Sequence, residues 1–131
     1  MFKVFALLCL FLSAAVTADS DEVNVTLSTG TVLRGKVCAG YETEGIRCFF
    51  GVPYAEPPTG DNRFRPTIPF NYTGIDSLLT KKHASRCMQG GRASVSEDCL
   101  FLDVYAPPAG VTPKAVMVFI HGGCFTNGGP V

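Results

Sequence analysis

The stretch AVMVFIHGGC, residues 115–124, decides the fold class predicted for this chain. Its first six residues, Ala115–Ile120, are apolar without interruption. Such a run is typical of a strand buried on both faces, as in a parallel sheet covered by helices. The sequence therefore predicts an α/β protein. Because almost no amphipathic helix is available to cover the strand, the chain is expected to be the opening part of a larger fold.

Composition excludes several classes of protein. The chain has 131 residues, 17% of them charged and 47% hydrophobic, and its 11 basic residues balance its 11 acidic ones. Without a basic excess, the charge gives no support to nucleic-acid binding. Low charge with high hydrophobicity excludes a solvated disordered chain, and the length allows one domain at most.

The N-terminus has the pattern of an export signal. Lys3 precedes the apolar run Val4–Ala15, small residues follow up to Ala18, and the chain then turns acidic. This order predicts a signal peptide over residues 1–18 and an exported part over residues 19–131. A transmembrane anchor is the alternative, but the run is shorter than the roughly 20 apolar residues that span a bilayer. We therefore expect a secreted protein without a membrane span.

Export permits disulfides and N-glycans. Cys9 is lost with the signal peptide, and five cysteines remain, so at most two disulfides form and one thiol is left over. The sequons at Asn24 and Asn71 are candidate glycosylation sites. Asn71 is the better candidate because it lies in a polar, turn-like stretch.

Periodicity predicts several β-strands before the apolar run. Alternating segments at 23–27 and 31–37, separated by a Ser-Thr-Gly turn, predict a hairpin. Segments 46–52 and 100–105 are predicted to be strands, the first because it is rich in aromatic and β-branched residues. The remaining expectations are a rigid, proline-rich connection over 53–69 and a short helical turn within 74–84.

The turn His121–Cys124 is the main candidate for chemistry. Acyl transfer requires a negative oxygen to be stabilised, and each backbone N–H aimed at it is worth about 3–4 kcal/mol of the barrier. Adjacent glycines let the backbone approach a substrate closely, and a His-Gly-Gly turn after a strand is the oxyanion-loop pattern of α/β-hydrolases. Taken alone, these residues favour an ordinary glycine-rich turn at the end of a strand.

Two further motifs, in the correct order with this turn, resemble the type-B carboxylesterases, which include cholinesterases and secreted fungal lipases. Glu97–Pro107 reads EDCLFLDVYAP and Phe50–Gly60 reads FGVPYAEPPTG, and both are similar to signature segments of the family. The segments starting at Cys87 and at Ala106 lean toward the fungal-lipase branch. The resemblance implies an α/β-hydrolase fold, of which this chain holds only the N-terminal antiparallel strands and the first core strands up to the oxyanion loop.

The resemblance also implies a role for the glycine-rich turn. Gly123 and Cys124 match two amide donors of the family's oxyanion hole, and Gly122 lies beside them. The family usually has Gly or Ala where this chain has Cys124, so the thiol could crowd the acyl pocket. Cys124 is therefore our choice for the unpaired cysteine.

Two structural pairs follow from the resemblance as well: the disulfide Cys87–Cys99 and the salt bridge between Arg63 and Glu97. Cys38 and Cys48 lie outside the family pattern. They flank a nine-residue turn between two predicted strands, so an additional hairpin disulfide is expected.

The Gly-x-Ser-x-Gly nucleophile elbow is missing from these 131 residues, and so are the acid and the histidine that follow it in chain order. Covalent acyl transfer needs a nucleophile and a base, so the chain alone is expected to be inactive. We interpret it as the start of a secreted esterase or lipase that hydrolyses a small-molecule or lipid ester through a serine acyl-enzyme. No metal or organic cofactor is implied.

Two other interpretations stay open. Catalytically inactive adhesion proteins of the neuroligin and glutactin type use the same fold, and the departure at Cys124 favours them. A serine in the downstream elbow would separate the two. Residues 19–131 could instead form a complete small β-domain with two disulfides, although the apolar strand argues against it.

Overall fold

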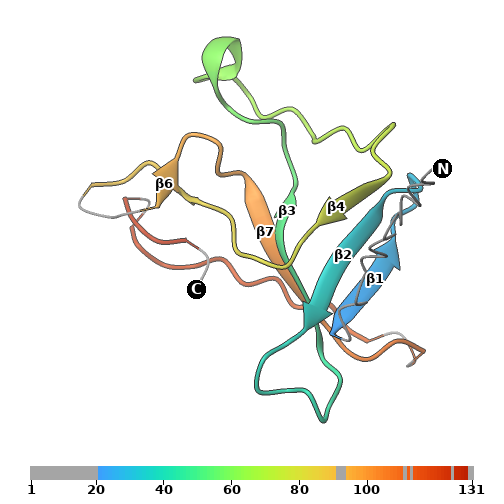
Figure 1. The fold of residues 1–131 in the computed structure, drawn as a ribbon. Coiled ribbons are helices and arrows are strands. Elements are labelled where there is room, and N and C mark those ends of the chain that lie inside the picture. Colours follow the sequence, from blue (N-terminus) through green and yellow to red (C-terminus); the bar gives the residue numbers. More distant parts are fainter. Residues whose placement is uncertain (1–20, 91–93, 111, 113, 125, 130–131) are drawn as a thin grey trace, which may run out of the picture.

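The computed structural model describes residues 21–90, 94–110, 112, 114–124 and 126–129, so the predicted signal peptide lies outside the described residues. The described part contains short strands and a single 3-10 turn, and no α-helix (Figure 1). Its main sheet has the order β1-β2-β3-β7, with β4 paired to β2, and β5 and β6 form a separate pair. The elements are β1 (Glu22–Thr26), β2 (Val32–Val37), β3 (Arg47–Pro53), η1 (Gly60–Asn62), β4 (Ser77–Leu79), β5 (Arg86–Cys87), β6 (Val95–Ser96) and β7 (Phe101–Ala106).

The predicted hairpin is confirmed. β1 and β2 pair antiparallel from Glu22 opposite Lys36 to Thr26 opposite Val32. The turn between them is closed by two backbone bonds and contains Gly30 at a φ of 90°, a value that favours glycine. Alternation along β1 places its apolar side chains against the core, so the local pattern and the tertiary structure agree.

β3 lies at the centre of the sheet, between β2 and β7. It pairs antiparallel with both, and its register to β7 shifts between Phe49 and Val52. Gly51 sits in this bulge at a φ of 66°, and its N–H donates to the Asp103 carboxylate at 2.8 Å. A Cβ there would approach the Lys82 carbonyl oxygen to 2.9 Å, so the bulge requires glycine.

The core consists of two clusters that share β3. Leu33, Phe49 and Val52 form the first, and partly buried apolar side chains of β1, β4 and Tyr72 pack against it. Cys38, Cys48 and Phe50 form the second. Consecutive residues of a strand point to opposite faces, so neighbouring phenylalanines of β3 can serve both clusters.

The helical turn predicted within 74–84 is wrong. Ser77–Leu79 instead forms β4, which pairs parallel with Val32–Arg34 of β2. Backbone bonds from Val32 N–H to the Asp76 carbonyl and from Thr80 N–H to the Arg34 carbonyl fix this pairing. Long-range pairing to an open strand edge outweighs the weak local tendency of a short segment to turn.

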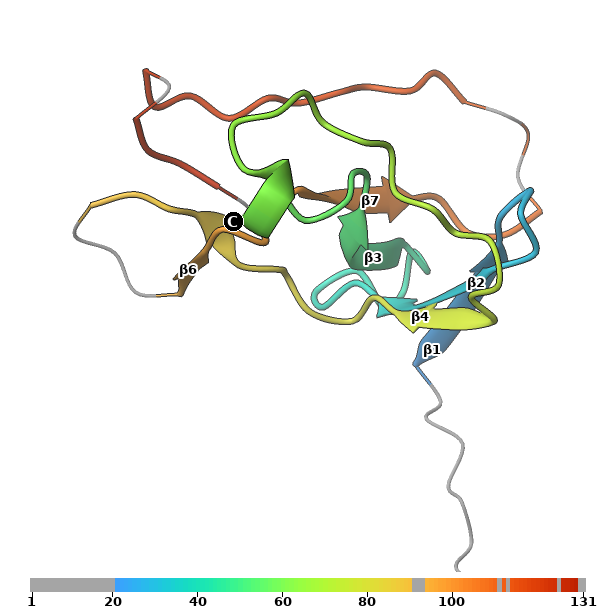
Figure 2. The same ribbon diagram turned by 90° about the horizontal axis from the view of Figure 1, so that it is seen from above.

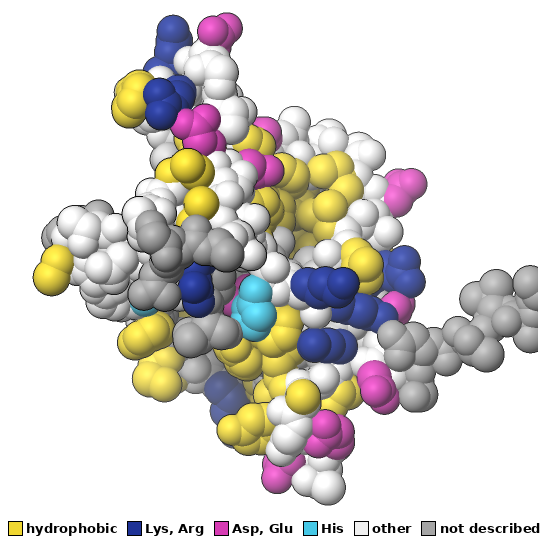
Figure 3. Space-filling model, turned by 60° about the vertical axis from the view of Figure 1, so that its left-hand side comes forward, with side chains coloured by type: hydrophobic (Ala, Val, Ile, Leu, Met, Phe, Trp, Pro, Cys, Tyr) yellow, Lys and Arg dark blue, Asp and Glu magenta, His cyan; other side chains and the backbone are white. Residues whose placement is uncertain are grey.

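The strand predicted over 115–120 is also wrong for this structure. The five residues Val116–Ile120 form no strand, and each is at least 83% exposed. Figure 2 shows this part of the chain running past β3 and β7 without joining them. Figure 3 shows hydrophobic side chains open to solvent among polar ones on one face. A strand buried on both faces needs flanking strands and covering helices, and the described residues provide neither.

Charged side chains link β1, β2 and the segment after β4. Glu22 forms ion pairs with Arg34 at 3.0 Å and with Lys81 at 2.9 Å. Hydrogen bonds from Arg34 and then Lys81 lower the pKa of Glu22 to about 2. The cluster therefore stabilises the fold at neutral pH, and this contribution is lost progressively as the pH falls from the ordinary Glu pKa of 4.5 to about 2.

Gly35 allows β2 and β3 to approach closely, and its replacement should be costly. A Cβ on Gly35 would overlap the Cys48 carbonyl oxygen and come within 2.6 Å of the Phe49 ring. Gly35→Ala is therefore expected to destabilise the complete protein by about 1–3 kcal/mol, as overpacking does. Denaturant unfolding measures the change. Gly90→Ala is the matched control, because a Cβ there meets no atom within 4 Å; equal midpoints for the two variants would contradict the expectation.

Candidate functional site

The glycine-rich turn has a backbone that its glycines make possible. Gly123 has a φ of 132°, and a Cβ there would overlap the Asn127 carbonyl. The Gly123 carbonyl accepts bonds from the Thr126 and Asn127 amides at 3.0 and 3.2 Å, which close the turn. His121 Nδ1 donates to the Gly122 carbonyl at 2.8 Å, so the imidazole supports the backbone of the turn.

The two amides that the resemblance assigns to the oxyanion hole are Gly123 N–H and Cys124 N–H. Within the described part of the chain, neither donates a hydrogen bond. Cys124 adopts a φ of 53°, and its thiol is free and exposed. A non-glycine residue in this left-handed region carries backbone strain of about 1–3 kcal/mol. The departure from the family pattern therefore falls on a strained position.

The turn lies at the surface, with His121, Gly122 and Cys124 exposed. A hollow of about 330 Å³ lies elsewhere, between β3, β4 and the start of β7. Thr80 is buried beside it, and its hydroxyl has no hydrogen-bond partner among the described residues. None of the described residues lining this hollow belongs to the glycine-rich turn. Among the described residues, the amide donors thus lie apart from this hollow.

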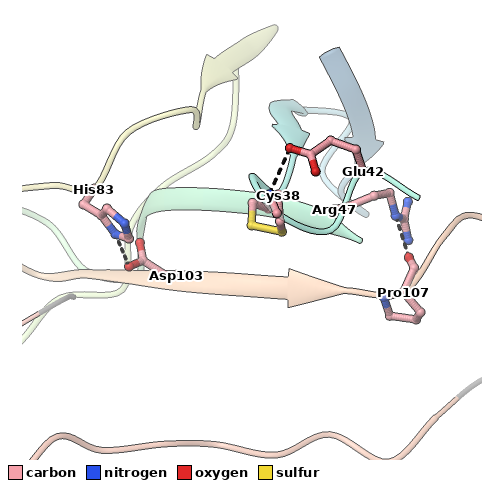
Figure 4. Close-up of a disulfide and its surroundings, with 8 residues drawn as sticks. Cys38, Glu42, Arg47, His83, Asp103 and Pro107 are labelled. Carbon is pink, nitrogen blue, oxygen red and sulfur yellow. Dashed lines mark hydrogen bonds and ion pairs between the residues drawn. A yellow bond between two sulfur atoms is a disulfide. The ribbon is translucent and has the colours of Figure 1, made fainter. Parts of the chain in front are cut away.

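The other cysteines form two disulfides, Cys38–Cys48 and Cys87–Cys99. Cys38–Cys48 closes the connection between β2 and β3 and belongs to the second core cluster (Figure 4). Within that connection the Gly40 N–H donates to the Glu42 carboxylate at 2.9 Å, and this bond lowers the pKa of Glu42. Cys87–Cys99 joins β5 to the segment before β7. By chain entropy, a cross-link of this loop size is worth about 3 kcal/mol.

Arg63 and Glu97 form the ion pair that the resemblance implies, at 2.5 Å. Their side chains are 54% and 38% exposed, so the pair contributes little to stability. Arg63 also stacks on the ring of Phe64, whose φ of 62° is unusual for a bulky residue. The pair connects the proline-rich segment with the acidic entry to β7.

Sequence reasoning missed one constellation, the pair of His83 and Asp103. His83 Nδ1 lies 2.6 Å from Asp103 Oδ2 (Figure 4). The imidazole also stacks on the ring of Phe50. The other carboxylate oxygen of Asp103 holds the Gly51 amide. Because both oxygens are engaged by the fold, we assign the pair to the bulge of β3. No spacing in the sequence indicates this contact.

Nothing in the described residues is arranged to hold a metal, since no three His, Cys, Asp or Glu side chains gather there. The described part also contains no helix long and apolar enough to span a membrane. The two sequons lie in different local structures: Asn24 lies within β1, whereas Asn71 lies in an exposed turn.

Comparison with known proteins identifies the family. A model of the carboxylesterase family matches residues 21–131. Human carboxylesterase 3 is 34% identical over 140 residues, which cover 92% of this chain and 24% of that protein. Chicken acetylcholinesterase is 33% identical, with 98% and 20% covered. Pig thyroglobulin is 39% identical, with 79% and 4% covered.

Solved structures agree with this assignment. A structure named PNB esterase matches with a TM-score of 0.67 and 34% identity, covering 80% of this chain and 21% of its own. A carboxylesterase of Geobacillus stearothermophilus matches with a TM-score of 0.67 and 31% identity, covering 80% and 20%. These proteins give no support to the predicted leaning toward fungal lipases.

The chain belongs to the carboxylesterase family. It spans about a quarter or less of the length of these relatives, and its strands are the N-terminal part of the carboxylesterase α/β-hydrolase fold. The predicted antiparallel strands are thus confirmed, whereas the core strand before the turn is not formed in this structure.

The disulfide pattern can be tested on the protein directly. Peptide mapping without reduction should find Cys38 linked to Cys48 and Cys87 linked to Cys99, because these pairs are joined in the structure. Cys124 should be alkylated without prior reduction, since its thiol is free and exposed. A disulfide that includes Cys124 would contradict the assignment, and a reduced digest is the control.

Proposed function

We propose that the complete protein hydrolyses carboxylic esters through a serine acyl-enzyme, with Gly123 and Cys124 N–H as oxyanion donors. The observation that carries the proposal is the turn in which these two consecutive amides donate to no described residue and the Gly123 carbonyl is engaged in closing the turn. Membership of the carboxylesterase family and relatives named carboxylesterase and acetylcholinesterase support it.

In this proposal the chain supplies electrostatic stabilisation and leaves bond making to residues outside it. A downstream serine attacks the ester carbonyl, and the carbonyl oxygen gains a negative charge as the tetrahedral intermediate forms. Fixed amides aimed at that oxygen stabilise the intermediate more than the neutral ester, so they lower the barrier to the chemical step. Substrates would be small-molecule or lipid esters.

A second candidate is a catalytically inactive binding protein with the same fold. The observation in its favour is Cys124, a side chain in the left-handed region of a turn whose family pattern has Gly or Ala. Similarity to thyroglobulin, whose name states no esterase activity, is consistent with this candidate. A transcript without a serine at the downstream elbow would select it over the esterase.

Ester hydrolysis tests the first candidate. The product of the complete reading frame should release p-nitrophenol from p-nitrophenyl butyrate, and replacing the elbow serine by alanine should abolish the activity. Gly123→Ala should lower kcat by about 100-fold or more, because the added Cβ displaces the turn and its donor.

Cys124→Ala provides the comparison for Gly123→Ala. It keeps the backbone N–H, so kcat should change less than about tenfold. Circular dichroism checks that each variant is folded. Loss of activity in Cys124→Ala as large as in Gly123→Ala would show that the thiol, and not the amide, matters.

We further propose that the protein is exported and glycosylated at Asn71. The Asn71 side chain is exposed, and its Oδ1 accepts a bond from the Thr73 N–H at 3.0 Å. Tyr72 packs inward and donates its hydroxyl to the Pro53 carbonyl at 2.5 Å, while burial raises the pKa of that hydroxyl. The sequon is thereby held on a fixed turn that faces solvent.

Expression in a eukaryotic cell tests export and glycosylation together. The protein should appear in the medium beginning at Asp19, and a glycosidase that removes N-glycans should reduce its mass. Asn71→Gln should remove the glycan, and Asn24→Gln is the matched control at the other sequon. A secreted Asn71→Gln variant that keeps its full mass would contradict the proposed site.

A further inference from the structure

The side chain of Gln89 connects Gly128, at the end of the segment that closes the glycine-rich turn, to a distant part of the chain. Gln89 Nε2 donates to the Gly128 carbonyl at 2.7 Å, and Gln89 Oε1 accepts from the Gly128 N–H at 2.9 Å. The carboxamide thus pairs with both polar backbone groups of Gly128, as a neighbouring strand would. Two bonds in opposite directions fix the orientation of Gly128 as well as its position.

Gln89 is itself well anchored. It is half-buried and lies two residues after Cys87, whose disulfide to Cys99 closes the loop. Its Nε2 also contacts the Cys87 carbonyl at 3.1 Å. The side chain of Arg86 lies against Gly129, because a Cβ there would come within 2.5 Å of the Arg86 Cγ. Arg86 and Gln89, on either side of the disulfide-bonded Cys87, therefore both contact the end of the turn.

The turn needs such a support because its own sequence provides little. Gly128 and Gly129 have φ values of 128° and 144°, which glycine adopts readily. Neither residue has a side chain that could pack against the rest of the chain. At the other end, the Thr126 and Asn127 amides bind the Gly123 carbonyl. Because these bonds connect Gly123 to the residues just before Gly128, a contact that holds Gly128 also holds Gly123.

We propose that Gln89 is a positioning residue that holds the Gly123 and Cys124 amides in their working orientation. The inference rests on the proposed esterase function for its catalytic consequence, but not for the structural brace. Gln89 does not contact the reacting atoms in this proposal; it acts through Gly128. Oxyanion donors must be fixed in advance to be effective, so a loosened brace should slow the chemical step and leave substrate binding nearly unchanged.

Hydrogen exchange on the complete protein tests the brace without requiring activity. Gln89→Ala should speed exchange of the amides at residues 126–128 about tenfold or more, because both bonds to Gly128 are lost. Met88→Ala is the matched control, since Met88 is adjacent in the loop and 63% exposed. Unchanged exchange in Gln89→Ala would overturn the proposal, whether or not the protein proves to be an esterase.

Kinetics test the catalytic consequence. If the wild type hydrolyses esters, Gln89→Ala should lower kcat per titrated active site about 10- to 100-fold and change KM less than about threefold. Wild-type kcat in this variant would overturn the positioning role. Absence of turnover in the wild type would instead reject the proposed function, and the exchange result alone would then decide the brace.

The pH dependence of kcat in Gln89→Glu distinguishes a positioning role from a merely structural one. An ionised carboxylate accepts from the Gly128 N–H but faces the Gly128 carbonyl without a proton to donate. A protonated carboxyl can donate and accept, as the amide does. The ratio of kcat in Gln89→Glu to kcat in the wild type should therefore rise as the pH falls toward the ordinary Glu pKa of about 4.3. A ratio that is independent of pH would contradict the role of the second bond.

Discussion

The path of β3 through the sheet is the constraint on which the rest of this structure depends. β3 pairs with β2 and β7, and its Phe50 N–H donates to the Thr80 carbonyl just after β4. It also contributes two buried residues to each core cluster, Phe49 and Val52 to the first and Cys48 and Phe50 to the second. The bulge at Gly51 lets one strand meet all these partners, and the Asp103 carboxylate holds the bulge in place. The pairing of His83 with the same carboxylate connects a surface loop to that point.

Local patterns predicted the parts of the fold whose partners are close in sequence. The β1–β2 hairpin follows from alternation and a glycine turn, and the Cys38–Cys48 disulfide follows from two strands joined by a short connection. β4 could not be found this way, because its partner β2 lies far earlier in the chain and three residues carry little periodicity. The contact between His83 and Asp103 likewise depends on how the bulge brings two strands together.

The apolar segment Val116–Ile120 shows a different limit of pattern reading. Its composition describes the environment that the residues require, which is burial on both faces. It does not say whether the residues that provide this environment belong to the same stretch of chain. The glycine-rich turn that follows can be recognised from its own residues, because the bonds that close it and the His121 contact lie within the same segment. The candidate donors were therefore predictable from sequence, and the Gln89 contact that braces them was not.

The exposed apolar segment has a consequence for biosynthesis. A run of β-branched and aromatic residues without charge is the kind of sequence that self-associates in cross-β form while it is unpaired. If further strands follow during synthesis, this segment stays exposed until they form, and chaperones would need to shield it. Its neighbours reduce the hazard: Lys114 precedes it, Pro107 and Pro108 lie upstream, and Gly122 and Gly123 end it. Charges, prolines and glycines beside an aggregation-prone segment limit how far an intermolecular strand can extend. The residues that shape the candidate oxyanion turn would then also act as aggregation gatekeepers during folding.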